Sequence, residues 1–478
     1  MSDNLILNKL WSACNRMRND SGTTGSLQYI EQFSWMLFLK VYEEVENEYE
    51  SKAVFEGKTY ERIIENKFRW STWASEKSDL TGSDLADFID EKLFPYMRSL
   101  DGSPEKETIA NVFINTKNLM EDGYILKEVI EIIANTEFNI EGSSFDITTI
   151  YDGLFSKMTS AELKPLAEIH TPRVVSKFMV EMIKPSIGDT IYEPCNGPSG
   201  FLVDSYVFMK NNAKTVNDSE ILQSKTFFGR ELKKLPYILG IMNMVLYGVN
   251  APNIVRGNTL EINLFDDIKK YDVILTNPPF SGTIKGNQSN FPYPAASTEI
   301  LFLQHVMRSL KNNGKCAIIL PEGVLFEDDT AYVNTKKELI SKFNLHRIVK
   351  LPRGTFAPYT DISTNILFFD EGSETKDIWF HEVPLPEGKK AYTKTKPLPD
   401  SAFKECRELW ADKKESETSW VVTVNDVIDN NYKLDFVNPS SKFEYEEILP
   451  HEIIAEVKTI HKDIENLIKD IDDLEKEL

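Results

Sequence analysis

The chain has 478 residues, 41% of them hydrophobic, which is enough for two or three globular domains and excludes an intrinsically disordered protein. Its 54 basic and 75 acidic residues give a formal net charge of −21, which argues against a protein that grips duplex DNA through a basic surface of its own. Four cysteines without a CxxC pair predict reduced thiols in the cytoplasm and neither a disulfide framework nor a zinc site.

Residues 1–155 are predicted to form an all-helical domain. The start, MSDNLILNKLW, lacks the basic and apolar segments of a targeting signal, and the longest apolar run, WMLFL, is too short to span a bilayer. Apolar side chains recur at steps of three and four, which places them on one helix face that we interpret as core: Ile30, Phe33, Leu37, Val41 and Val45. Few strand signals occur in this region.

An α/β domain is predicted for residues 156–370. Seven short β-rich runs alternate with helical stretches after residue 185: DTIYE, TFFGRE, NIVRG, YDVILTN, KCAIILPEG, HRIVKLP and TNILFFD. This alternation predicts a doubly wound, Rossmann-like parallel sheet with crossover helices on both faces. In such open sheets, ligands bind outside the carboxyl ends of the strands.

The last two regions are predicted to be a mixed polar extension, 371–440, and a coiled-coil helix, 441–478. The extension contains one strand candidate, SWVVTV, and suggests no function. In the helix, apolar residues alternate at steps of four and three: Ile453, Val457, Ile460, Ile464, Leu467, Ile471, Leu474 and Leu478. Such a seam needs a partner helix within this chain or, as we expect, on another protein.

The loop after the first predicted strand, in YEPCNGPSGF, is a candidate ligand site. Glu193 and Pro194 precede Gly197, Ser199 and Gly200 at the start of a helix. Glycines permit a tight turn and close backbone approach, and the helix N-terminus offers free N–H groups to a ligand that carries a carboxylate. A plain structural turn would use the same residues.

The next two strands end in further candidates. Glu231 closes the second strand, where an acidic residue typically accepts hydrogen bonds from ribose hydroxyls. A solvated acid at a helix N-terminus would look the same in sequence. Asn258 follows the third strand at the same edge of the predicted sheet.

The fourth strand ends in TNPPF, with Asn277, Pro278, Pro279 and Phe280. Two prolines remove N–H donors and restrict the backbone, so the Asn amide oxygen and a Pro carbonyl form a fixed pair of acceptors suited to an exocyclic NH₂ group. Phe280 adds a flat face on which a ring can stack. The alternative is a rigid turn with a core phenylalanine.

Together these motifs resemble the N6-adenine DNA methyltransferases, and the whole chain is similar to the modification (M) subunit of type I restriction-modification systems. The similarity covers nearly the full length. Its more specific stretches are HTPR at 170–173, Glu299 followed by ILFLQH, LPEGVLF, LPRGTFAPYT and TNILFF.

The resemblance implies S-adenosylmethionine as the cofactor, bound by the loop after the first strand with Phe201, by Glu231 and by Asn258, and covered by His170, Thr171 and Pro172. It implies that Asn277 and Pro278 accept hydrogen bonds from the N6 amino group of a flipped adenine and that Phe280 stacks on the base. Neither a metal nor a covalent intermediate is needed. The implied partners are DNA, a specificity (S) subunit docked on the C-terminal helix, a second M subunit and a restriction (R) subunit.

The cofactor loop departs from the family pattern of Asp-Pro, two small residues and Gly-Thr-Gly-Gly-Phe. Glu193 replaces Asp, Pro198 stands at the Thr position and Ser199 at a Gly position. Asn258 stands where Asp is common, and Ile169 and His170 replace an aromatic pair. Two alternatives therefore stay open: a silent methyltransferase-fold scaffold, and an NPP-type methyltransferase of protein or RNA. The latter would not need the large helical domain or the C-terminal partner helix.

Overall fold

The computed structural model describes most of residues 3–440, with Lys458 and His461 beyond them; the gaps are Glu76, Asn115, 137–152, 155–170 and Glu387. One compact unit ends at Phe436 and a second begins at Val437. The predicted coiled-coil helix lies outside the described residues except at two positions, and the four domain boundaries stay predictions. No helix in the described part of the chain is long and apolar enough to cross a membrane.

The N-terminal region is helical, as predicted, and its described residues 3–136 contain no strand. Its helices are α1 (Asp3–Met17), α2 (Ser26–Phe55), α3 (Trp70–Trp73), α4 (Gly82–Asp87), α5 (Phe94–Arg98), α6 (Pro104–Ile114) and α7 (Gly123–Ala134), with a 3-10 turn at Asn66–Phe68 and a π-helical segment at Phe88–Leu93. The predicted apolar stripe of α2 is in the core. Other faces of α2 are buried as well, because α1, α3, α7 and α13 all contact it.

The rest of the compact unit is built on a nine-stranded sheet in the order β3-β2-β1-β4-β5-β7-β6-β8-β9. The strands are β1 (Ile191–Glu193), β2 (Phe227–Glu231), β3 (Asn253–Arg256), β4 (Tyr271–Thr276), β5 (Leu310–Pro321), β6 (Phe343–Lys350), β7 (Thr364–Glu371), β8 (Asp377–Glu382) and β9 (Ser419–Thr423). All seven predicted strands are present.

The expectation of an all-parallel sheet was wrong in its second half. β7 runs antiparallel to both β5 and β6. No helix occurs between β6 and β7, and a direct return without a crossover helix leaves neighbouring strands antiparallel. The polar extension adds β8, parallel to β6, and β9, antiparallel to β8, so it continues the same sheet.

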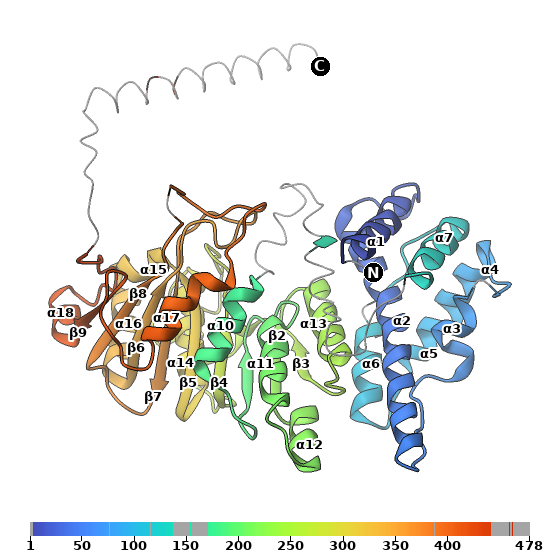
Figure 1. Ribbon diagram of the computed structural model, residues 1–478, viewed down its shortest axis with the longest axis horizontal. Helices are drawn as coiled ribbons and strands as arrows, with labels where there is room; N and C mark the ends of the chain where they lie inside the picture. The colour runs from blue at the N-terminus through green and yellow to red at the C-terminus, as the bar shows by residue number, and fades with distance from the viewer. Residues whose placement is uncertain are drawn as a thin grey trace. The chain divides into compact units, whose positions relative to one another are not determined.

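Helices cover both faces of the sheet, as expected for strands whose side chains alternate between two cores. Val273 and Leu275 of β4 face one core, whereas Ile274 between them faces the other. The first core receives α10 (Arg173–Ile183), α11 (Gly200–Lys210) and α13 (Lys234–Leu246), and the second receives α14 (Thr298–Ser309), α15 (Glu322–Phe326) and α16 (Thr330–Lys342) (Figure 1). The described part of the unit also contains α12 (Val216–Ser224), α17 (Lys404–Leu409) and α18 (Val424–Asp429).

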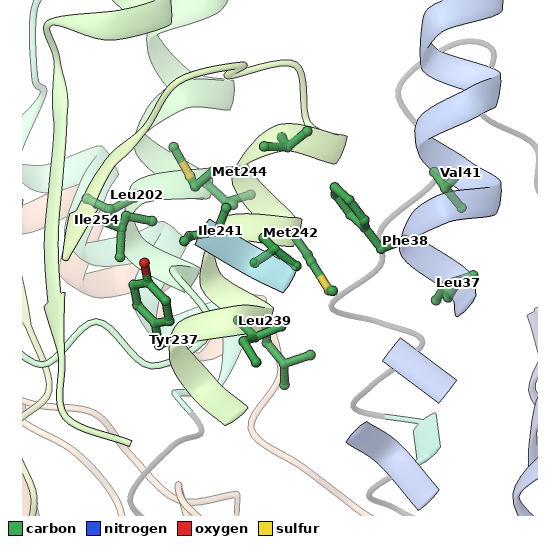
Figure 2. Packing of buried hydrophobic residues seen from close by; sticks show 14 of the residues in the cluster. Leu37, Phe38, Val41, Leu202, Tyr237, Leu239, Ile241, Met242, Met244 and Ile254 are labelled. Carbon is green, nitrogen blue, oxygen red and sulfur yellow. The ribbon is translucent and has the colours of Figure 1, made fainter. Parts of the chain in front are cut away.

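Helix α13 joins the N-terminal helices to the sheet. Its inner face packs on β2 and β3, and Met242 on its other side points toward Phe38 of α2 (Figure 2). Polar contacts flank this apolar seam: Lys234 Nζ lies 2.5 Å from Glu31 Oε1, and the Tyr49 hydroxyl donates to Asn250 Oδ1 at 3.2 Å. Because α13 lies directly behind the loop after β1, this packing also fixes the back wall of the candidate site.

Candidate active site at the carboxyl ends of the strands

The sequence motifs meet at one edge of the sheet. β2, β1 and β4 are adjacent and parallel, so their carboxyl ends lie side by side. These ends carry Glu231, Glu193 and Asn277 respectively. The predicted site residues are thereby gathered by the sheet order alone.

The loop after β1 is held by two amide side chains, one within the loop and one from α13. Asn196 Nδ2 donates to Ser199 Oγ at 2.7 Å and to the Gly197 carbonyl at 3.1 Å. From α13, Asn243 Nδ2 donates to the Pro198 carbonyl at 2.8 Å. Gly197 and Ser199 both have positive φ, 50° and 64°, and this left-handed conformation explains why glycine suits the Ser199 position. The serine is accommodated with its hydroxyl bonded to Asn196.

Two glycines outside the loop make room for it. A Cβ on Gly229 of β2 would lie 2.5 Å from Asn196 Oδ1, and one on Gly240 of α13 would lie 2.6 Å from Asn196 Nδ2 and 2.7 Å from Ser199 Oγ. By contrast, a Cβ on Gly200 would meet no atom within 4 Å. The loop is therefore tightly backed by protein, and open space lies on its Gly200 side.

Two buried carboxyl groups define the electrostatics beside this loop. Glu231 Oε2 accepts from the Gly197 N–H at 2.8 Å, and Oε1 accepts from the Lys233 N–H at 2.8 Å. Burial raises the pKa of Glu231 in spite of these bonds. Burial, reinforced by the charge of Glu231, raises the pKa of Glu193 well above its ordinary value, and Glu193 Oε2 has no hydrogen-bond partner among the described residues. The pair therefore favours a cationic ligand group, which would lower the cost of ionising both carboxyls.

The remaining cofactor candidates occupy supporting positions. Asn258 Oδ1 caps a 3-10 turn, Thr259–Glu261, by accepting from the Leu260 N–H at 3.0 Å. The carbonyl of Pro194 accepts from the Thr259 hydroxyl. Phe201 is fully buried in the core below the loop, so its side chain supports the loop from beneath.

The Asn277 amide has a defined orientation. Its Nδ2 donates to Thr171 Oγ1 at 3.0 Å, while its Oδ1 has no hydrogen-bond partner among the described residues. The structure thus brings together a residue predicted to contact the base and one predicted to cover the cofactor. Because the N–H side of the amide is already engaged, the oxygen remains to accept a hydrogen bond from a ligand.

The prolines and Phe280 complete this side of the site. The Pro278 carbonyl accepts no hydrogen bond within the described part of the chain, so it is a second available acceptor. Phe280 is half-buried, and its ring contacts Phe356 of the LPRGTFAPYT stretch edge to face, with centroids 5.4 Å apart. One aromatic edge contact fixes the ring without occupying both its faces.

The segment before α10 is anchored to the helix that follows the loop. Pro172 occupies the N-cap of α10, and Arg173 Nη2 pairs with Asp204 Oδ1 of α11 at 2.8 Å. Ser176 Oγ also donates to Asp204, at 2.6 Å. These contacts place Thr171 beside Asn277. His170 lies outside the described residues.

Asn196 and Asn243, which hold the loop, were not predicted from the sequence. Asn243 interrupts an apolar helical run, LGIMNMVL, and is 1% exposed. A polar residue in such a run indicates a specific buried partner, and this signal could have identified Asn243. Its partner could not be read from the sequence, because it lies 45 residues away.

Comparison with known families supports the interpretation of these motifs as those of an N6-adenine DNA methyltransferase. Residues 143–448 match the family described as N-6 DNA Methylase, and residues 6–133 match the HsdM N-terminal domain. The two matches span the sheet with its motifs and the helical region respectively.

Individual relatives extend over almost the whole chain. It is 36% identical over 476 residues to the type I restriction enzyme EcoEI methylase subunit of Escherichia coli, covering 96% of this chain and 95% of the relative. A modification subunit of a type I restriction enzyme from Vibrio vulnificus is 37% identical with a TM-score of 0.85, covering 92% and 98% of the two chains. A solved chain from a study of complex assembly and conformational transition of the type I R-M system is 38% identical, with a TM-score of 0.77 and 99% coverage of both. These matches confirm the predicted fold class and resemblance.

Proposed function

This chain belongs to the N-6 DNA methylase family, and we propose that it methylates adenine at N6 in DNA as the modification subunit of a type I restriction-modification complex. This proposal rests on the Asn277 amide, whose nitrogen donates to Thr171 and whose buried oxygen has no hydrogen-bond partner among the described residues. An exocyclic amino group needs such an acceptor.

The residues beside β1 and β2 fit S-adenosylmethionine. When bound, this cofactor supplies an electrophilic methyl group on a sulfonium centre. Burial raises the pKa of both carboxyl groups, and a cationic group of the cofactor beside the unpartnered Oε2 of Glu193 would offset this by favouring their ionised forms. The open space at Gly200, at the N-terminus of α11, suits its carboxylate. Glu231 accepts a hydrogen bond from the Gly197 N–H. We therefore assign Glu231 two roles: it shapes the loop, and it accepts hydrogen bonds from the ribose hydroxyls of the cofactor.

On the base side, the chain positions the target nitrogen. Asn277 Oδ1 and the Pro278 carbonyl accept from the two amino hydrogens of adenine, and the Phe280 ring stacks on the base. The adenine must leave the duplex stack, because its N6 atom is not reachable there. Acceptors that form hydrogen bonds with the two amino hydrogens make the nitrogen more nucleophilic. The rigid Pro-Pro backbone keeps these acceptors in place, so catalysis rests on positioning.

The partners follow from the same proposal. The chain acts on DNA with a specificity subunit, a second modification subunit and a restriction subunit, in the cytoplasm. A net charge of −21 requires that much of the positive surface facing the DNA comes from those partners. The predicted C-terminal coiled-coil helix would dock on the specificity subunit.

The proposal is tested by co-expressing the chain with the specificity subunit from its own locus and measuring N6-methyladenine in treated DNA by mass spectrometry. We expect N6-methyladenine only when both subunits and S-adenosylmethionine are present. Absence of product, with no calorimetric heat on adding S-adenosylmethionine, would replace the proposal by a silent scaffold.

A further inference from the structure

A pocket lies on the sheet beside the end of α14, and neither the loop after β1 nor Glu231 nor Asn277 lines it. Its volume is about 460 Å³, and its walls come from β2 and β3, from the segment that leads into β4 and from the end of α14. The lining includes Asn253 and Tyr271, the first residues of β3 and β4. It therefore extends toward the amino ends of these strands, whereas Asn277 and Glu231 lie at their carboxyl ends.

Three aromatic side chains form one wall of this pocket. Tyr192 and Tyr271 stack with ring centroids 4.2 Å apart, and Phe228 meets Tyr271 at 5.4 Å. Tyr192 and Tyr271 are held in the core, with 4% and 8% of their surface exposed. The two stacked tyrosines make the wall rigid, and the half-buried Phe228 is the ring that a ligand can contact.

Two cations face the same space. Arg230 and Lys269 line the pocket, and no carboxylate does. Neither side chain forms an ion pair with any residue in the described part of the chain. Lys269 Nζ instead lies over the Phe228 ring, 3.5 Å from its centroid. In a chain with 75 acidic residues, two cations without a carboxylate beside an aromatic wall leave a local excess of positive charge.

A buried histidine adds an unused polar atom. His305 of α14 lines the pocket and is 1% exposed. Its Nε2 lies 3.3 Å from both the Tyr192 hydroxyl and Ser309 Oγ, and its Nδ1 has no partner among the described residues. Burial, with the charge of Arg230 adding to it, lowers the pKa of His305 to about 3, so the ring is neutral and contributes a hydrogen bond and no charge.

We propose that this pocket binds a small anion that carries a flat ring, of the nucleoside monophosphate class. The Arg230 guanidinium presents the planar fork that suits a phosphate, and Lys269 supplies a second charge from the rim. The base packs on Phe228, the half-buried ring of the aromatic wall. The volume lies within the range of small-molecule sites, roughly 300–1,000 Å³. This site is additional to methyl transfer and does not depend on it.

The test is calorimetric titration of the full chain with AMP, with and without excess S-adenosylmethionine. We expect AMP to bind in both conditions, because none of the residues assigned to the cofactor lines the pocket. Adenosine and inorganic phosphate should each bind more weakly than AMP, since adenosine lacks the phosphate and inorganic phosphate lacks the base. Arg230→Gln should weaken AMP binding by about tenfold or more, as expected when a charge-assisted contact is lost.

Lys270→Gln is the matched control, because this exposed lysine adjoins Lys269 and does not line the pocket. It should leave AMP affinity unchanged. If Arg230→Gln does not fold, Lys269→Gln at the exposed rim takes its place, with an expected loss of about threefold or more. The proposal is overturned if AMP does not bind at millimolar concentration, if S-adenosylmethionine displaces it completely, or if the substituted pocket binds it as well as the native one.

Discussion

The two sides of the candidate active site differ in what their polar side chains bond to. On the cofactor side, Glu231, Asn196 and Asn243 form hydrogen bonds that hold the loop after β1, and Glu193 Oε2 beside it has no partner among the described residues. On the base side, Asn277 Oδ1 and the Pro278 carbonyl have no partner in the described chain. The cofactor side is therefore a loop whose shape depends on hydrogen bonds from several elements, whereas the base side presents two acceptors that hold no loop in place. Substitutions on the first side should alter cofactor affinity, and substitutions on the second should alter transfer.

Loss of the Asn277 acceptor should have the largest effect. Asn277→Ala should lower the rate of methyl transfer by about 10²–10³-fold, as seen when one preorganised hydrogen-bonding group is removed from an active site. Phe280→Ala should cost less, about 10–100-fold, because it removes stacking alone. S-adenosylmethionine affinity, measured by calorimetry, should stay within about threefold of the native value in both. Equal losses of cofactor affinity and of methyl transfer in these variants would contradict the assignment of Asn277 and Phe280 to the base side.

The reverse pattern is expected at Glu231. Glu231→Gln removes the charge that bonds the Gly197 and Lys233 N–H groups. Cofactor affinity should fall by about 10–100-fold, the worth of a charge-assisted hydrogen bond, while transfer at saturating cofactor stays near native. Asp267→Asn, at an exposed position in the loop before β4, is the control and should change neither quantity. A defect in transfer that saturating cofactor does not repair would contradict the assignment.

Thr171 links the two sides, so it sharpens the comparison. Thr171→Val keeps the side-chain shape but removes the oxygen that accepts from Asn277 Nδ2. The amide loses its fixed orientation, and single-turnover transfer should slow by up to about tenfold. Thr171→Ser retains the hydroxyl and should restore most of the rate. If valine and serine behave alike, the hydrogen bond does not orient the amide.

A pair of glycine substitutions should give the smallest effects and separates the back of the loop from its open side. Gly240→Ala places a Cβ 2.6 Å from Asn196 Nδ2, and overpacking of this kind typically costs about 1–3 kcal/mol of stability. Gly200→Ala meets no atom within 4 Å and should leave the melting temperature equal or higher. Its cofactor affinity should nevertheless fall a few fold, since the ligand approaches there. Unchanged affinity in Gly200→Ala would place the cofactor elsewhere.

Much of this site could be predicted because it depends on local patterns. The apolar runs that end at Glu193, Glu231 and Asn277 predicted three strands, and the sheet order brings their carboxyl ends together. The antiparallel β7 was not predicted, because an apolar run carries no information about strand direction. The pairs Thr171–Asn277 and Asn243–Pro198 were not predicted either, since they depend on how distant elements pack.

The most direct test of the account is modification-aware sequencing of the source genome after deletion of this gene and complementation with the native chain or with Asn277→Ala. We predict that N6-methyladenine disappears from one split, asymmetric DNA sequence motif in the deletion strain. It should return with the native chain and stay absent with Asn277→Ala, although that variant still binds S-adenosylmethionine. Methylation that persists after deletion, or that Asn277→Ala restores in full, would contradict the central role of the Asn277 acceptor in adenine methylation.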